Sequence, residues 1–299
     1  MRILIAGCGY VGLALGSELI RQGHSVVGIR RSEDAATQLR EAGIEPLVTD
    51  LSRPDFKGPE GRFDWVVYCA SAGRDGGIES YRSVYVDGLR NLLARLASNP
   101  PQKFVYTGST SVYAQQDGSS VKESSLAEPT APTARILLEA ESLLLETGKK
   151  IGIPSAVLRI AGIYGPGRLH LLHSFIRNEV RIAGQGIRNL NMIHRDDVVA
   201  AILAVLRSGR GGEIYNVVDQ EPVTEIHFYT WLAETLGKWV PPSGPDDAAR
   251  APANRKISNR RLTMELGCRL TYPTFRQGYT AEIKALTDAG LLDIPREER

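Results

Sequence analysis

The first part of the chain alternates short apolar runs with stretches of helical periodicity. Ile3–Ala6 is a continuous apolar run, as in a buried strand. After a short turn, Val11, Leu15 and Leu19 recur at every fourth position, which gives a helix one apolar face that can pack on a sheet. The order of these segments predicts a strand, a tight turn and a helix packed on the strand.

The same alternation continues along the chain. Further apolar runs predict strands at residues 24–29, 43–48, 65–70, 104–107 and 154–159. The helices predicted after the fourth and fifth strands have apolar faces made of Leu89, Leu92, Leu93 and Leu96 and, from about Pro132 onward, of Ile136, Ala140, Leu143 and Leu144. Strands that alternate with helices at this spacing indicate βαβ units, and therefore an α/β fold with a parallel sheet.

The turn between the first strand and the first helix contains a glycine-rich motif. Gly7, Gly9 and Gly12 form G-x-G-x-x-G, with Tyr10 and Val11 between the last two glycines. In a dinucleotide-binding loop the first glycine allows the tight turn, the second lets the backbone approach a pyrophosphate, and the third permits close helix–strand packing. The helix N-terminus then offers free N–H groups to the phosphates. A purely structural turn is the alternative, but the strand–turn–helix context favours a nucleotide site.

The end of the second predicted strand bears on the choice of nucleotide. An NAD enzyme places an acidic residue there, against the ribose 2′-hydroxyl. This chain has Arg30 and Arg31 instead, and guanidinium groups can make charge-assisted hydrogen bonds to a 2′-phosphate. A solvated basic turn is one alternative, and Glu33 or Asp34 binding a ribose is another. We expect NADP, with NAD as the alternative.

Other predicted strands end in residues that belong at the same edge of the sheet. Ligands of a doubly wound parallel sheet gather beyond the carboxyl ends of its strands. Small residues after the fourth strand suit close approach of a cofactor, although any tight turn could use them. The residues that we expect at this cofactor-binding edge are Asp50 and Leu51, Ala70, Ser71 and Ala72, and Ser109.

Composition narrows the class of protein. The 299 residues are 42% hydrophobic and 23% charged, as in an ordinary globular protein, and the net charge of +2 gives no reason to expect a nucleic acid or a membrane as a partner. The three cysteines are far apart and form no C-x-x-C pair, which fits a reducing cytoplasm and no zinc site. No stretch approaches the roughly 20 apolar residues of a membrane span.

Two polar stretches predict loops. Residues 114–133 are polar and contain proline, and we expect them to form a long loop over the site. Residues 241–252 are rich in proline, alanine and aspartate, and we expect a mobile loop.

Beyond the glycine motif, four segments resemble the extended short-chain dehydrogenase/reductases, the NAD(P)-dependent epimerase/dehydratase group. They are Ser109–Tyr113, Arg159–Arg168, Met192–Asp197 and Tyr215–Val217. The resemblance implies a Rossmann domain, from residues 1–163 and 192–218, and a smaller C-terminal substrate domain, from residues 164–191 and 219–299. It also implies hydride transfer to or from a carbonyl carbon, often of a nucleotide sugar.

The resemblance does not extend to the family's acid–base catalytic residues. The family uses a Ser or Thr with a Y-x-x-x-K pair, and Ser109 matches the serine. Alignment on Pro132 and Glu141 places Thr133 at the tyrosine and Leu137 at the lysine. An aliphatic hydroxyl stays protonated across the working pH range and Leu137 supplies no charge, so a surviving reductase needs another proton donor.

Two tyrosines are substitute candidates for that proton donor. Tyr113 follows Ser109 by four residues and could face the same cleft, although a packed aromatic is the simpler interpretation. Tyr85 stands where the family has an asparagine on the preceding helix. The leucine-rich helices could also form the four-helix homodimer contact of related enzymes, but core burial explains the same leucines.

Three histidines are further candidates for a metal site or a substrate pocket. His170 and His173 share a helical face but have no clustered third ligand, so we do not expect a metal. We expect His194–Asp197 to be a strand end and helix cap in which Asp196 or Asp197 accepts backbone N–H groups, and His194 could line the substrate pocket.

The sequence therefore predicts an NADP(H)-dependent oxidoreductase or epimerase that acts on a small polar carbonyl or nucleotide-sugar-like substrate. Ser109, Thr133, Tyr113 and Tyr85 are its candidate catalytic residues. A non-catalytic NADP(H)-binding sensor is the alternative, because the Tyr/Lys pair is missing.

Overall fold

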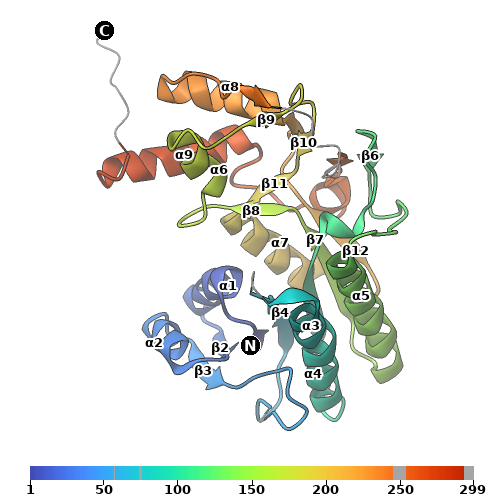
Figure 1. The fold of residues 1–299 in the computed structure, drawn as a ribbon. Coiled ribbons are helices and arrows are strands. Elements are labelled where there is room, and N and C mark those ends of the chain that lie inside the picture. Colours follow the sequence, from blue (N-terminus) through green and yellow to red (C-terminus); the bar gives the residue numbers. More distant parts are fainter. Residues whose placement is uncertain (57, 74–75, 245–253, 293–299) are drawn as a thin grey trace.

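The computed structural model describes residues 1–292 except 57, 74–75 and 245–253. Its centre is a parallel seven-stranded sheet in the order β12-β7-β5-β4-β1-β2-β3 (Figure 1). The α/β fold with a doubly wound parallel sheet is confirmed. The strands are β1 (Arg2–Ala6), β2 (Ser25–Arg30), β3 (Glu45–Val48), β4 (Trp65–Tyr68), β5 (Lys103–Ser109), β7 (Ser155–Ile160) and β12 (Ile214–Val217).

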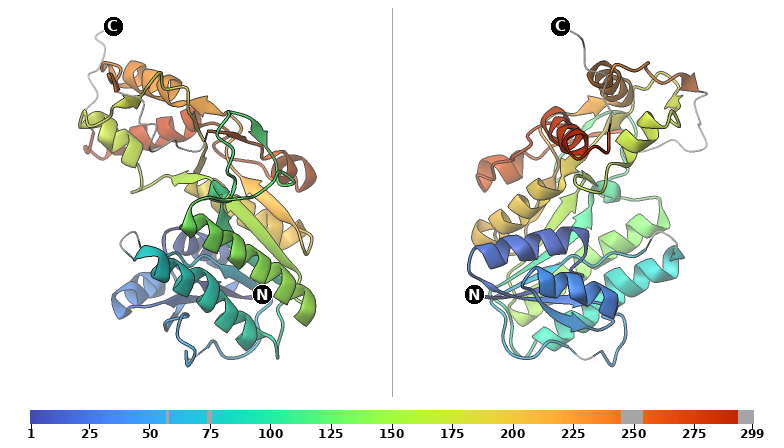
Figure 2. Two further views of the ribbon diagram at one scale, coloured as in Figure 1. Left: turned by 45° about the vertical axis from the view of Figure 1, so that its right-hand side comes forward. Right: turned by 90° about the vertical axis from the view of Figure 1, so that its left-hand side faces the viewer.

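Helices cover both faces of this sheet (Figure 2). One layer contains α1 (Tyr10–Arg21), α2 (Glu33–Glu41) and α7 (Arg195–Ser208), and the other contains α3 (Gly77–Arg82), α4 (Gly88–Leu96) and α5 (Pro132–Ile151). Strand β1 shows why its run is apolar throughout, because Ile3 and Ile5 pack in the first layer while Leu4 and Ala6 pack in the second.

The strand order reverses at β1. From β1 the chain proceeds outward through β2 and β3, and then returns to the other side of β1 through β4 and β5. After β1 the chain enters α1 on one face of the sheet, and after β4 it enters α3 and α4 on the other face, so a crevice forms at the carboxyl edge between them.

A smaller unit lies beyond this edge (Figure 1). Its own apolar core contains Tyr164, Phe175, Phe228 and Tyr279. Its elements are β8 (Gly162–Tyr164), α6 (His170–Ile176), β9 (Ile182–Ala183), β10 (Asn189–Leu190), β11 (Met192–His194), β13 (Val223–Thr224), α8 (Glu225–Leu236), β14 (Ser243–Gly244) and α9 (Phe275–Asp288).

The predicted loops differ from the structure. Residues 114–133 contain β6 (Ser120–Val121), which pairs with β15 (Lys256–Ile257). That pairing anchors the segment beside the sheet, and Ile257 and Leu262 join the core of the α1 layer rather than that of the smaller unit. Within residues 241–252, Ser243–Gly244 is β14, and residues 245–252 lie outside the described part of the chain.

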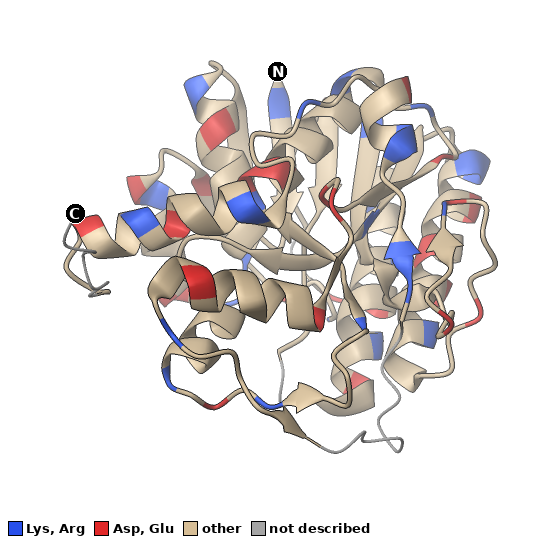
Figure 3. Ribbon diagram, turned by 90° about the horizontal axis from the view of Figure 1, so that it is seen from above, with Lys and Arg blue, Asp and Glu red and all other residues tan. Residues whose placement is uncertain are grey.

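The predicted leucine-rich faces are used within the chain itself. Leu89, Leu92, Leu93 and Leu96 are all buried in the layer between α4, α5 and the sheet, so core burial accounts for them. Basic and acidic residues are interspersed along the elements (Figure 3). None of the helices that the structure describes is long and apolar enough to cross a membrane.

Candidate functional site

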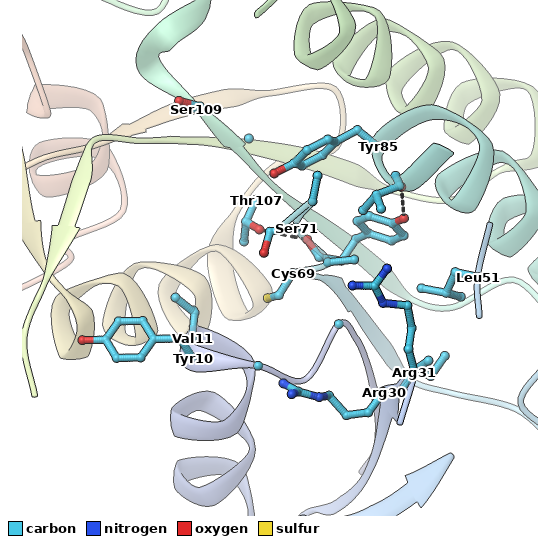
Figure 4. Close-up of a pocket in the computed structure, with 18 of the residues that line it drawn as sticks. Tyr10, Val11, Arg30, Arg31, Leu51, Cys69, Ser71, Tyr85, Thr107 and Ser109 are labelled. Carbon is cyan, nitrogen blue, oxygen red and sulfur yellow. Dashed lines mark hydrogen bonds between the residues drawn. The ribbon is translucent and has the colours of Figure 1, made fainter. Parts of the chain in front are cut away.

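A pocket of about 720 Å³ lies at the carboxyl edge of the sheet, at the reversal of strand order. It extends from the end of β2 across the loops after β1 and β4 to the end of β5 (Figure 4). Among the residues that line it are the predicted Gly7, Gly9, Tyr10, Val11, Arg30, Arg31, Asp50, Leu51, Ala70, Ser71, Ala72, Tyr85 and Ser109.

The glycine loop forms the floor of this pocket. Gly7 has φ +83°, and a Cβ built on it would lie 2.2 Å from the Cα of Ala70. Both the backbone conformation and the lack of space therefore require glycine in the turn after β1. Gly12 does not line the pocket; its Cβ would lie 3.0 Å from Ile5 Cγ2, which reflects close packing of α1 on β1. No side chain caps α1, so its first-turn N–H groups are available to an anion.

Arg30 and Arg31, at the end of β2, line the same pocket as the glycine loop. Arg30 donates from Nη1 to the carbonyl oxygen of Cys8 at 3.1 Å, which holds its guanidinium beside the loop. Arg31 is exposed and also lines the pocket, whereas Glu33 and Asp34 do not. The arrangement favours the two arginines over the two acids as the groups that meet a ribose or its phosphate.

Tyr85 points into the pocket from the layer that contains α3, α4 and α5 (Figure 4). It lies in a π-helical turn, Ser83–Asp87, between α3 and α4. Burial, and next the neighbouring Tyr81, raise its pKa to about 12, while a hydrogen bond with the backbone of Ala72 opposes the shift. The phenol is therefore protonated at neutral pH.

Ser109 ends β5 at the pocket and is half-buried. Its Oγ accepts a hydrogen bond from the backbone N–H of Ser111 at 3.1 Å, which caps the short 3₁₀ turn Thr110–Val112. The hydroxyl hydrogen remains available to donate to a bound group.

Tyr113, a candidate proton donor, does not line this pocket. Its side chain is 1% exposed, its hydroxyl donates to Oδ1 of Asn216 at 2.9 Å, and the guanidinium of Arg159 lies 4.8 Å over the ring. Thr133 is half-buried in the first turn of α5 and is also outside the pocket lining, while Leu137 is buried in the core. The simpler interpretation, a packed aromatic, therefore holds for Tyr113.

The cap of α7 also differs from expectation. The Nδ1 of His194 accepts from the N–H of Asp196 at 3.2 Å, so Nε2 carries the proton and donates to Glu282 at 3.0 Å. Asp197 instead accepts from the backbone N–H groups of Thr271 and Tyr272. His194 is buried and does not line the pocket. Within the described ranges, no three His, Cys, Asp or Glu side chains gather as a metal site would require.

Several side chains that line the pocket were not predicted, among them Tyr81 and Arg168. Tyr81 precedes Tyr85 by one helical turn, and their rings lie 5.3 Å apart. Arg168 comes from the loop between β8 and α6. The signal for each was present, in the i, i+4 tyrosine pair and in the final residue of the Arg159–Arg168 segment.

The sequence profile of the NAD dependent epimerase/dehydratase family matches residues 3–218. The chain belongs to this family. It is 29% identical over 280 residues to protein YeeZ of Escherichia coli K12, covering 91% of this chain and 96% of that protein.

Solved structures show the same fold. A conserved protein of unknown function from Silicibacter pomeroyi is 28% identical, with a TM-score of 0.76 and coverage of 94% of this chain and 97% of that one. UDP-glucuronic acid 4-epimerase of Bacillus cereus, in complex with NAD, is 21% identical, with a TM-score of 0.78 and coverage of 97% and 99%. The latter likeness concerns the fold alone.

Proposed function

We propose that this chain is an NADP(H)-dependent oxidoreductase that acts on a small polar carbonyl or a nucleotide-sugar-like compound. The observation that carries the proposal is the pocket, which is continuous from Arg30 and Arg31, across the glycine loop, to Tyr85 and Ser109. A dinucleotide is long enough to need such a series of sites, and the family to which the chain belongs is NAD dependent.

The preference for NADP rests on charge. Arg30 and Arg31 stand where an NAD enzyme has a carboxylate, and a 2′-phosphate would pair with both guanidinium groups. A carboxylate at that point would repel the phosphate. The carboxylate that does line the pocket, that of Asp50, accepts hydrogen bonds from the N–H and the hydroxyl of Ser52.

The proposed chemistry gives two side chains a direct part. A bound dinucleotide would supply the hydride. Ser109 would donate a hydrogen bond to the substrate oxygen, and Tyr85 would give that oxygen its proton. A phenol whose pKa is about 12 is a weaker acid than a lysine-activated tyrosine, yet it still protonates an alkoxide, which is more basic.

The substrate class is inferred from likeness. The similar fold of Bacillus cereus acts on UDP-glucuronic acid, as its name states, and the smaller unit of this chain lies over the same edge as the pocket. We propose that this unit closes over a polar substrate of comparable kind.

A substrate panel tests the proposal. Purified protein saturated with NADPH is mixed with keto acids, aldoses, ketoses and nucleotide sugars, and the loss of NADPH absorbance is followed. The proposal expects turnover with at least one class of carbonyl. If nothing in the panel is reduced although the cofactor is bound, the oxidoreductase proposal fails.

A second function is favoured by one observation. Leu137 lies in the core and Thr133 lies outside the pocket, so neither aligned position supplies an acid. In this second function the chain is a non-catalytic protein, and its binding to a partner depends on whether NADP(H) is bound. Affinity capture of partners with and without NADPH tests this function, and identical partners in both samples would remove its support.

A further inference from the structure

Tyr10 is the first residue of α1, directly after Gly9 of the glycine motif. Two arginines lie over its ring. The guanidinium carbon of Arg168 is 5.5 Å from the ring centroid, and that of Arg195 is 5.4 Å from it. The two cations line different hollows of the surface. Arg168 lines the pocket, whereas Arg195 lines a neighbouring groove on the outer side of α1. The pocket and the groove meet at Gly9 and Tyr10, which line both.

The two arginines also differ in their partners. Arg195 donates from Nε to Oδ1 of the adjacent Asp196 at 2.9 Å, so its charge is compensated. Arg168 is exposed, and within the described ranges its guanidinium makes no hydrogen bond or ion pair. Contact with the face of an aromatic ring holds a cation in place without using its N–H donors. Arg168 therefore presents a free fork of donors at the glycine loop.

The backbone around Arg168 is shaped to bring it there. Gly165 has φ +140° and Gly167 has φ +73°, on either side of Pro166, and the N–H of Arg168 donates to the carbonyl of Gly165 at 2.8 Å. Residues other than glycine rarely adopt these φ values. A Cβ on Gly165 would also lie 3.2 Å from the hydroxyl of Tyr10, so this loop rests on the start of α1.

We propose that Arg168 is a pyrophosphate-binding residue, which reaches from the loop between β8 and α6 to the diphosphate of a dinucleotide seated on the glycine loop. The inference rests on the proposed dinucleotide binding and adds a cationic contact from the side opposite the α1 N–H groups. A planar guanidinium matches two phosphate oxygens, and no carboxylate partner among the described residues competes for it. The contact joins the segment that leads into the smaller unit to the cofactor itself.

The test uses two nucleotide fragments and a matched pair of variants. ADP-ribose contains the pyrophosphate without the nicotinamide or the 2′-phosphate, and 2′-AMP contains the 2′-phosphate without the pyrophosphate. Calorimetry compares wild type, Arg168→Met and the control Arg195→Met, which removes the other cation over the same ring. We expect Arg168→Met to weaken ADP-ribose about tenfold while 2′-AMP is unchanged, since a hydrogen bond to a charged group has about this effect. Arg195→Met should change neither affinity more than about twofold.

The outcomes are distinguishable. If wild type binds ADP-ribose and Arg168→Met binds it equally well, the inference is wrong while dinucleotide binding stands. An equal loss in both variants would mean that Arg168 acts through the position of Tyr10, and this too overturns the inference. A wild-type chain that binds neither ADP-ribose nor NADPH overturns the proposed function, and the inference with it. Arg168 is exposed in a loop, so unchanged melting temperatures without nucleotide should show that the variant is folded.

Discussion

The backbone of Gly7 lies against that of Ala70: a Cβ on Gly7 would stand 2.2 Å from the Cα and 2.3 Å from the N of Ala70. The turn after β1 and the turn after β4 are thus in contact where the strand order reverses. This contact forms the base of the pocket, and it leaves no room for a side chain on the first residue of the glycine motif.

Gly7→Ala should therefore lose both stability and nucleotide binding. The control is Gly23→Ala, because Gly23 has nearly the same φ, +80°, with nothing within 4 Å of its Cβ. Backbone strain alone should cost Gly23→Ala about 1–2 kcal/mol of unfolding free energy, and the added clash should bring Gly7→Ala to roughly 2–5 kcal/mol. Urea unfolding measures both, and equal losses would contradict the close contact.

The cofactor preference predicts an asymmetric effect of Arg30→Ala. Loss of one guanidinium–phosphate contact should weaken NADPH about tenfold to a hundredfold and leave NADH within about threefold. Arg40→Ala is the control, since Arg40 pairs with Glu33 on the surface away from the pocket. Titration of both nucleotides measures the ratio. An equal loss for NADPH and NADH would assign Arg30 a structural role, through its bond to Cys8.

Removal of the Tyr85 hydroxyl should separate catalysis from binding. Tyr85→Phe should lower kcat about 10²–10⁴-fold on any carbonyl that the wild type reduces, while the affinity for NADPH changes little. Because burial raises the pKa of Tyr85 to about 12, the wild-type rate of reduction should not vary with ionisation of this group at neutral pH. Tyr81→Phe, in the same pocket, is the control and should keep most of its activity. Full activity in Tyr85→Phe would exclude it as the proton donor.

Asp219 should make stability depend on pH. Its side chain is 4% exposed, Oδ2 has no hydrogen-bond partner among the described residues, and burial, followed by the charge of Glu221, raises its pKa well above the ordinary value. Below the unfolded pKa of about 3.9 the group is protonated in both states. As the pH rises from there to the folded pKa, the unfolded chain ionises and the folded chain does not, so stability falls.

Asp219→Asn should remove that loss. We expect equal Tm near the unfolded pKa and a variant that is about 2–4 °C more stable at neutral pH, which corresponds to roughly 1 kcal/mol for a chain of this size. Asp117→Asn is the control with the opposite sign, because hydrogen bonds from Ser119 lower the pKa of Asp117. A gain in Tm for Asp219→Asn that is the same at both pH values would contradict the ionisation argument.

The sheet and its edge could be predicted because their signals are local. Each apolar run of the Rossmann part precedes a turn whose residues lie at the carboxyl end of a strand, and the fold then brings these ends together. The lining of the pocket, from Arg30 to Ser109, follows from that geometry. The choice between Arg30 and Glu33 could not be made in this way, because it depends on which side chains turn toward the pocket.

Contacts between distant segments were not predictable from periodicity. The pairing of β6 with β15 joins two-residue strands that are separated by well over a hundred positions. The partner of Tyr113, Asn216, lies on another strand of the sheet, so periodicity could not show what its hydroxyl binds. The cap of α7 was assigned to the wrong side chain because His194 is held by Glu282 of α9. In each case the partner lies far away in the sequence and is brought close only by the tertiary fold.

Direct titration of the purified protein with NADPH and NADH tests the central claim. The account predicts saturable binding of one dinucleotide per chain, with NADPH the tighter of the two. Failure to bind either nucleotide would contradict it.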